Sequence, residues 1–175
     1  MRVLVFDKHF SRKFAINGAL VRNGFIRIIN QVLCLHKGPI LKFHLYIPNI
    51  SLDIFQEIDQ WMLVLSRNGV KELILNNLNR RYELPSHVFS CQELTNLELH
   101  KCFFKPPLEF DGFLNLEDLY LENVNFGAKL CGTQISLPQL KALSIQSCTN
   151  VYNFNIKATK LQSLFVIACP DAMLL

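Results

Sequence analysis

One apolar pattern, repeated along most of the chain, limits the possible folds more than any other feature of the sequence. An apolar residue is followed by further apolar residues three, five and eight positions later, and this arrangement occurs six times. Successive repeats start 30, 24, 22, 24 and 21 residues apart. The six repeats begin at Ile40, Val70, Leu94, Leu116, Leu140 and Leu161. Because alternate residues are apolar, each repeat predicts a short strand that buries one side only.

The pattern matches the leucine-rich-repeat signature L-x-x-L-x-L-x-x-N/C. A single coil of this kind cannot bury its apolar side alone, so neighbouring coils must stack and share a core. Chance spacing of leucines along amphipathic helices is the alternative, and six copies in one frame disfavour it. We therefore predict an α/β leucine-rich-repeat solenoid of about seven coils, formed as a single domain over residues 1–175. Its parallel sheet should curve around a concave side.

Two intervals leave room for a helix on the convex side, and the first follows a strand expected at Val3–Phe6. Apolar residues at steps of four and three predict that this helix buries Val21, Phe25, Ile28, Val32 and Leu35. His36 and Lys37 should lie in its last turn, where cations complement the helix dipole. Gly38 is suited to a left-handed cap and Pro39 cannot continue the helix, so we expect the helix to end near Lys37.

The second helix should occupy the interval between the repeats at Ile40 and Val70. Its predicted buried residues are Ile54, Ile58, Trp61 and Leu65. Asp53 with Gln56 resembles a capping box, and Gly69 should close the end. The later coils contain Pro85, Pro106, Pro107 and Pro138 and are too short for a long helix, so their outer segments should be extended or irregular.

Several segments also resemble the plant F-box/FBD/leucine-rich-repeat proteins, in the same order and nearly from end to end. They are residues 4–7 (Leu-Val-Phe-Asp), 36–40 (His-Lys-Gly-Pro-Ile), 59–61 (Asp-Gln-Trp), 65–69 (Leu-Ser-Arg-Asn-Gly), 84–85 (Leu-Pro) and 89–94 (Phe-Ser-Cys-Gln-Glu-Leu). The resemblance implies repeats that select a protein target for ubiquitination. In that family an F-box precedes the repeats and docks on the adaptor of an SCF-type ubiquitin ligase, and an FBD domain follows them. Neither module is recognisable in this chain, so the SCF adaptor is an expected partner only if an F-box lies upstream in the full gene product.

Motifs for catalysis, metal or cofactors are not recognisable. The six cysteines include no C-x-x-C pair and no histidine at a zinc-ligand interval, and no glycine-rich phosphate loop is present. Cys102, Cys148 and Cys169 occupy the ninth repeat position, which favours a packing role, while Cys34, Cys91 and Cys131 have no assigned role. We expect no metal, no cofactor and no enzymatic activity. The absence of a secretory signal or a long apolar run predicts an intracellular protein of the cytoplasm, the nucleus or both, without a membrane span.

The residues that alternate with the buried leucines should face the concave side, the usual binding surface of a solenoid. We select ten of them as candidate protein-binding residues: His44, Tyr46, Glu72, Ile74, Glu98, His100, Asp118, Tyr120, Glu122 and Phe165. Acidic side chains in the middle coils surround Tyr120, which predicts a basic partner segment held by an apolar anchor on that tyrosine. Alternatively, exposed apolar residues such as Phe165 and Ile167 pack under a C-terminal domain.

Charge is unevenly distributed and offers a second functional hypothesis. Residues 1–50 contain eight Lys and Arg residues and a single acid, Asp7, a net charge of +7, whereas residues 83–122 carry a net charge of −6. The alternative function is therefore binding of nucleic acid or another anionic surface through the first helix and its surroundings. The basic residues concerned are Arg12, Lys13, Arg22, Arg27 and Lys37. Their scattered spacing and the acidic concave centre make nucleic acid the less favoured partner.

Overall fold

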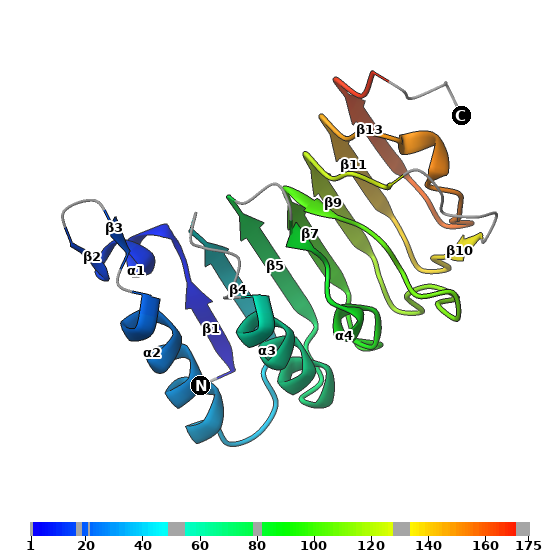
Figure 1. The fold of residues 1–175 in the computed structure, drawn as a ribbon. Coiled ribbons are helices and arrows are strands. Elements are labelled where there is room, and N and C mark those ends of the chain that lie inside the picture. The colour runs from blue at the N-terminus through cyan, green and yellow to red at the C-terminus, as the bar shows by residue number, and fades with distance from the viewer. Residues whose placement is uncertain are drawn as a thin grey trace.

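A seven-stranded parallel sheet forms the framework of the molecule (Figure 1). The computed structural model describes residues 2–16, 19–20, 22–48, 55–78, 82–127 and 134–170. In spatial order the strands are β1 (Val3–Phe6), β4 (Lys42–Ile47), β5 (Glu72–Asn77), β7 (Asn96–His100), β9 (Asp118–Glu122), β11 (Ala142–Gln146) and β13 (Ser163–Ile167). Each strand pairs with the strand of the preceding coil, which confirms the predicted solenoid.

Burial alternates along these strands as the repeat predicts. In β4, β5, β7 and β11 every second residue is buried and those between are half-buried, because one side of the sheet faces the core. Leu73, Leu97, Leu119 and Leu143 occupy the same register position and are at most 3% exposed. Stacking of identical positions thus builds one continuous core beneath the sheet.

Each of the last four coils leaves its strand through the same backbone turn. The residues that follow β7, β9, β11 and β13 are Lys101, Asn123, Ser147 and Ala168, and all have φ between 50° and 54°. The N–H groups of the first three donate to carbonyl oxygens of the next coil at 2.8–2.9 Å. These bonds pair backbone polar groups that would otherwise be left unsatisfied at the turn.

The convex side carries longer helices near the N-terminus and short elements elsewhere (Figure 1). Its elements are α1 (Lys8–Arg12), the hairpin of β2 (Ala15–Ile16) and β3 (Ala19–Leu20), α2 (Arg22–Leu35), α3 (Phe55–Arg67), α4 (Ser86–Phe89), the short parallel pairs β6 (Tyr82–Glu83) with β8 (Cys102–Phe103) and β10 (Ile135–Ser136) with β12 (Ile156–Lys157), and a 3₁₀ turn at Val151–Asn153. The later coils are therefore mostly extended or irregular, as predicted. Among the described residues no helix is long and apolar enough to cross a membrane.

Helix α1 was not predicted, although its capping residue is clear in the sequence. Asp7 accepts a hydrogen bond from the backbone N–H of Phe10 at 2.8 Å, as an N-cap residue does. The same bond is the main reason that the pKa of Asp7 lies below its usual value. The helix places Phe10 against Phe6 of β1 and Phe25 of α2, with ring centroids 5.0 and 5.6 Å apart.

The predicted buried face of α2 is wrong in part. Phe25, Ile29 and Leu33 are the buried residues, whereas Leu35 is 78% exposed and Ile28 and Val32 are half-buried. Val21 lies outside the described residues. The helix is turned because Phe25 packs against aromatic rings on several sides, including Phe14 at 6.1 Å and Trp61 of α3 at 6.5 Å between ring centroids. These partners come from α1, the turn after it and α3, so the spacing within α2 does not reveal them.

The ends of α2 and α3 agree with the glycine signals to within two residues. Helix α2 ends at Leu35, so His36 and Lys37 follow it rather than forming its last turn, and Gly38 adopts a left-handed φ of 91°. Helix α3 buries the predicted Ile58, Trp61 and Leu65 and also Met62. Gly69, with φ of 66°, follows its end. Ile54 and the capping-box residue Asp53 lie outside the described residues.

Phenylalanine rings fill the core behind the later coils. Phe104 contacts Phe89, Phe126 and Phe154 with ring centroids 5.2–5.7 Å apart, and Phe126 stacks on Phe154 at 4.6 Å. These rings come from successive coils and occupy the space that a long helix would otherwise fill. Aromatic stacking therefore replaces helix packing where the coils are short.

Strand β13 differs from the other six strands of the main sheet because all five of its residues are exposed. Leu164 and Val166, which pair with the buried Leu143 and Ile145, are 50% and 41% exposed. We therefore expect this chain to self-associate at tens of micromolar, since exposed apolar side chains at a sheet edge favour association. Light scattering checks this, and Leu164→Glu with Val166→Lys should reduce the association. A clean monomer for the unmodified chain would contradict the prediction.

Candidate functional site

The concave face of the sheet consists of three rows of side chains that cross the strands. Here we define the concave face as β4, β5, β7, β9, β11 and β13 together with these rows. The first row is Lys42, Glu72, Asn96, Asp118, Ala142 and Ser163. The middle row is His44, Ile74, Glu98, Tyr120, Ser144 and Phe165. The third row is Tyr46, Asn76, His100, Glu122, Gln146 and Ile167. The structure places all ten sequence-selected residues on this face.

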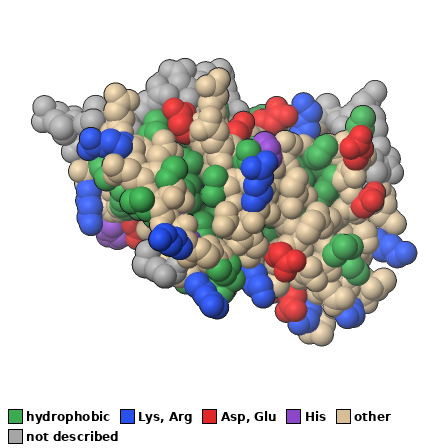
Figure 2. Space-filling view, turned by 90° about the horizontal axis from the view of Figure 1, so that it is seen from below, with side chains coloured by type: hydrophobic (Ala, Val, Ile, Leu, Met, Phe, Trp, Pro, Cys, Tyr) green, Lys and Arg blue, Asp and Glu red, His purple; other side chains and the backbone are tan. Residues whose placement is uncertain are grey.

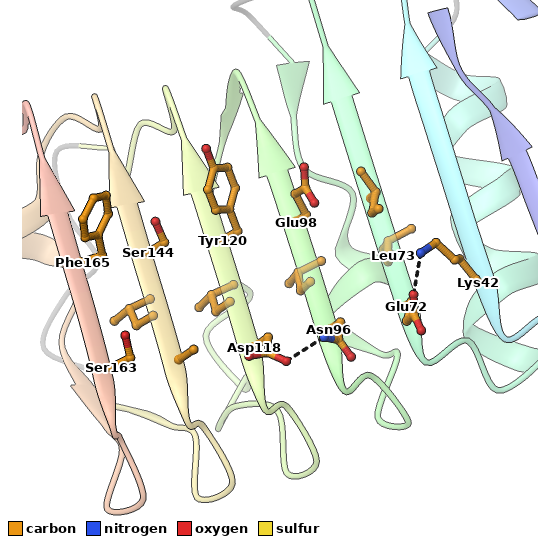
Figure 3. A pocket seen from close by; sticks show the side chains of 15 residues that line it. Lys42, Glu72, Leu73, Asn96, Glu98, Asp118, Tyr120, Ser144, Ser163 and Phe165 are labelled. Atoms are coloured by element: carbon orange, nitrogen blue, oxygen red, sulfur yellow. Dashed lines mark hydrogen bonds and ion pairs between the residues drawn. The ribbon is translucent and has the colours of Figure 1, made fainter.

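A groove of about 380 Å³ runs along the first and middle rows (Figure 3). The backbone of the strand leucines contributes to its floor, while their side chains point into the core. Its rim carries Glu72, Glu98 and Asp118 together with the rings of Tyr120 and Phe165. It draws residues from all six strands of the concave face, whose coils are far apart in the sequence. The groove therefore exists only because the coils stack. Its mixed apolar and acidic lining suits an extended peptide or a single side chain of a partner better than a metal ion.

His100 links the acidic residues of the third and middle rows. Its Nδ1 lies 2.8 Å from Oε2 of Glu122, and its Nε2 lies 2.6 Å from Oε1 of Glu98. Each ring nitrogen of His100 therefore lies within hydrogen-bond distance of one carboxylate. The His100 side chain is 12% exposed, while those of Glu98 and Glu122 are 40% and 37% exposed. The histidine thus holds two carboxylates in fixed positions beside Tyr120.

The other acidic residues of the face also have polar partners within the protein. Lys42 Nζ lies 2.8 Å from Oε2 of Glu72, and Asn96 Nδ2 donates to Oδ2 of Asp118 at 2.8 Å. Side chains of neighbouring strands therefore orient these two carboxylates. The face still carries four carboxylates against one lysine, so it is acidic.

Tyr120 is less available than its position in the repeat suggests. It is half-buried, its ring lies 5.4 Å from that of His100, and its hydroxyl donates to Oε2 of Glu122 at 3.4 Å. Burial raises the pKa of the Tyr120 hydroxyl, and the negative charges of Glu122 and Glu98 raise it further. On the same row, burial lowers the pKa of His44, and Glu98 opposes that effect. Tyr120 can therefore offer a ring surface but not a free hydroxyl.

Two small residues that sequence reasoning did not select shape the groove. Ala142 and Ser144 on β11 lie between β9 and β13, and in the middle row Ser144 pairs with both Tyr120 and Phe165. Figure 3 shows Ser144 between these two rings. Alignment of the repeats would have revealed this arrangement, because the three residues share one repeat position. Lys42, Asn96 and Ser163 complete the groove lining.

The basic residues of the alternative hypothesis lie away from the concave face. Arg12 and Lys13 are exposed at the end of α1, and Arg27 and Lys37 are exposed on and after α2. The side chain of Arg22 is outside the described part of the molecule. Figure 2 shows the Lys and Arg side chains of one face dispersed among acidic, apolar and uncharged ones. The described basic residues on that face form separate patches rather than one continuous surface.

The cysteines pack in the core or lie apart from one another. Cys102 and Cys148 are buried at the ninth repeat position and Cys169 is half-buried, which agrees with a packing role, and Cys91 is also buried. Cys34 is exposed, and Cys131 lies outside the described residues. Within the described ranges, no three His, Cys, Asp or Glu side chains are grouped so as to hold a metal ion.

These environments predict selective thiol reactivity. Burial raises the pKa of the Cys91 and Cys102 thiols to about 12 and that of Cys148 to about 11. Because the thiolate is the reactive form, iodoacetamide at neutral pH should modify Cys34 in the native chain and spare these three. Peptide mapping by mass spectrometry checks this, with urea-unfolded protein as the control. Equal labelling of Cys34 and Cys102 before unfolding would contradict the packing described here.

Comparison with known proteins agrees with the repeats and with the predicted resemblance. A family model described as "At1g61320/AtMIF1, LRR domain" matches residues 32–174. An F-box/FBD/LRR-repeat protein of Arabidopsis thaliana, At1g13570, is 38% identical over 151 residues, which cover 84% of this chain and 35% of that protein. The chain thus spans about a third of the length of this curated relative. No solved structure matches the chain. The chain belongs to the At1g61320/AtMIF1 leucine-rich-repeat domain family.

Proposed function

We propose that this chain is a protein-recognition module that binds a segment of a partner protein in the groove of the concave face. The observation that carries the proposal is the groove itself, in which six stacked strands present fixed carboxylates beside exposed apolar surface. The partner segment should be basic, because the four carboxylates outnumber the single lysine of the face. The module acts by binding and not by catalysis.

The similarity to an F-box/FBD/LRR-repeat protein supports a more specific role. We propose that the repeats select a target for an SCF-type ubiquitin ligase, provided that the full gene product carries an F-box. Sequencing the transcript upstream of Met1 tests this condition. If an F-box is found, the SCF adaptor should co-purify with the full product, and the repeats alone should retain the target without the adaptor.

Affinity purification from an Arabidopsis extract tests the binding face. The unmodified chain is compared with Tyr120→Ala on the concave face and with a matched convex variant, Arg27→Ala with Lys37→Ala. A partner that is lost only with Tyr120→Ala supports the proposal. A partner that tolerates Tyr120→Ala and is lost with the convex variant overturns it in favour of the basic N-terminal surface, and nuclease treatment then shows whether nucleic acid is involved.

For a purified partner, Tyr120→Ala should weaken binding by about 2 kcal/mol or more, mainly through faster dissociation, because it removes a half-buried ring from the centre of the face. Tyr120→Phe retains the ring and loses only the bond to Glu122, so it should bind nearly as well as the unmodified chain. Surface plasmon resonance measures both rates. Equal losses for the two variants would show that the hydroxyl, and not the ring, is what matters.

The acidic rim should act mainly on the rate of association. Glu98→Lys reverses a charge that is 40% exposed beside the groove, so we expect slower association with a basic partner and a weaker dependence on salt. Measuring the association rate at several salt concentrations checks this expectation. A rate that is unaffected by salt in the unmodified chain would contradict electrostatic steering.

A further inference from the structure

Within the groove, a strand that carries small side chains lies between two strands that each carry an aromatic ring. Tyr120 on β9, Ser144 on β11 and Phe165 on β13 are paired directly across the sheet, and the first row adds Ala142 on β11 and Ser163 on β13. Figure 3 shows the two rings on either side of Ser144. We call this space the Tyr120–Phe165 slot; its floor is Ala142 and Ser144, and its walls are Asp118, Tyr120, Ser163 and Phe165.

The width of the slot follows from strand spacing. Neighbouring strands lie about 4.8 Å apart, so β9 and β13 are about 9.6 Å apart. A group held above Ser144, at the height of the rings, is therefore displaced sideways by about 5 Å from the strand that carries each ring. A cation is attracted to the face of an aromatic ring within about 6 Å of its centroid, so this spacing suits a cation between the two rings. Phe165 is 51% exposed, so its ring remains accessible to a ligand in the slot.

The slot also carries negative charge at one wall. Asp118 precedes Tyr120 by two residues and faces the same side of β9. Its Oδ2 accepts from Asn96 at 2.8 Å, while Oδ1 has no hydrogen bond within the described part of the chain. Beyond Tyr120, the carboxylates of Glu98 and Glu122 are held by His100. An uncharged apolar group in the slot would exclude water from Asp118 without replacing its hydrogen bonds.

We propose that the Tyr120–Phe165 slot binds an arginine side chain of the partner protein. A guanidinium group is planar and stacks on aromatic rings, and it donates two parallel hydrogen bonds to a carboxylate such as that of Asp118. A lysine ammonium supplies the charge but neither the plane nor the paired donors. The inference rests on the proposed function and replaces the apolar anchor expected from the sequence with a cationic one.

Peptide titrations followed by NMR of the isotopically labelled chain test the ligand class. The probes are acetyl-Gly-Gly-X-Gly-Gly-amide peptides in which X is arginine, lysine or citrulline, the neutral isostere of arginine. The arginine peptide should cause saturable shifts of the Ala142, Ser144 and Phe165 amides, the lysine peptide should bind at least fivefold more weakly, and the citrulline peptide should not saturate. Equal responses to arginine and citrulline would overturn the inference.

Variants of the floor and the wall test the position. Ser144→Leu should fill the slot and reduce arginine-peptide affinity at least tenfold, whereas Ser144→Ala should bind like the unmodified chain. Both substitutions lie at a half-buried position on the concave face, and the amide spectrum shows whether the fold is retained. Asp118→Asn should lower affinity severalfold and reduce the preference for arginine over citrulline. Unchanged binding by Ser144→Leu would overturn the assignment.

The same variants separate this inference from the proposed function. A natural partner that is lost with Glu98→Lys or Ile74→Asp but binds Ser144→Leu normally would overturn the slot and leave recognition by the concave face intact. A partner that tolerates all three substitutions would overturn both. Loss of the partner with Ser144→Leu but not with Ser144→Ala would support both.

Discussion

Leu97→Ala should lower the free energy of unfolding by about 2 to 5 kcal/mol, because it removes a buried side chain from the core shared by neighbouring coils. Leu97 is 1% exposed and lies in register with Leu73 and Leu119 on the adjacent strands. The cavity would be bounded by side chains of three coils, which are held in place by their own strand pairing and cannot close it fully. Urea unfolding followed by circular dichroism measures the difference.

The next residue supplies the control. Glu98→Ala should cost less than about 1 kcal/mol, because it removes one hydrogen-bonding contact with His100 from a side chain that is 40% exposed. Adjacent substitutions should therefore differ strongly although both are changes to alanine in the same strand. Similar unfolding midpoints for the two variants would contradict the strand register.

Gly112→Ala should destabilise the protein by about 3 kcal/mol or more, for a reason unrelated to apolar burial. Gly112 has φ of 139°, and a Cβ atom built there would lie 1.8 Å from the carbonyl oxygen of Ser136. The two residues form a bridge between successive coils, and the neighbouring Asp111 carbonyl accepts from the Ser136 N–H at 2.6 Å. Because the obstacle is backbone, neither segment can move without disturbing the coil contact.

Gly127→Ala is the matched control for this prediction. Gly127 also has a positive φ, 67°, but a Cβ atom there meets nothing within 4 Å. Its substitution should cost about 1 to 2 kcal/mol through backbone conformation alone. The difference between the two variants in equilibrium unfolding measures the effect of the close coil contact. If both lose the same stability, Gly112 is needed only for its φ angle.

The positions of the strands, and the side of each strand that is buried, were predictable because every repeat has the same spacing of apolar residues. A leucine at +3 and another at +5 must share a side of the strand, so a one-residue error would expose the whole apolar set. This information is local, and the observed register of Leu97 with Leu119 and Leu143 follows from aligning the repeats. The coarse position of the concave residues therefore required no structure.

The buried face of α2 was not predictable in the same way. Its orientation depends on Phe10, Phe14 and Trp61, which approach Phe25 from outside the helix. Several rotations of the helix bury comparable apolar area when only its own spacing is considered. Tertiary packing determines which rotation the helix adopts, so the sequence of the helix alone does not predict it.

The chemistry of the candidate site was predictable only in its residue types. Acidic residues near Tyr120 were evident, but the bonds from His100 to Glu98 and Glu122 depend on side-chain rotamers across neighbouring strands. The slot was missed for a different reason, since Ala142 and Ser144 matter through their small size. Neither residue carries a charged or aromatic group that would mark it in the sequence as part of a binding site.

The uniform turn after each of the last four strands bears on how such a chain changes over evolutionary time. Lys101, Asn123, Ser147 and Ala168 mark equivalent points at which one coil ends and the next begins. A duplication or deletion whose boundaries fall at two of these points adds or removes a whole coil and leaves the remaining strands in register. Recombination in genes of this type can therefore lengthen or shorten the recognition surface by one strand at a time. Each added or removed strand changes each of the three rows by one residue, and the retained coils keep their fold.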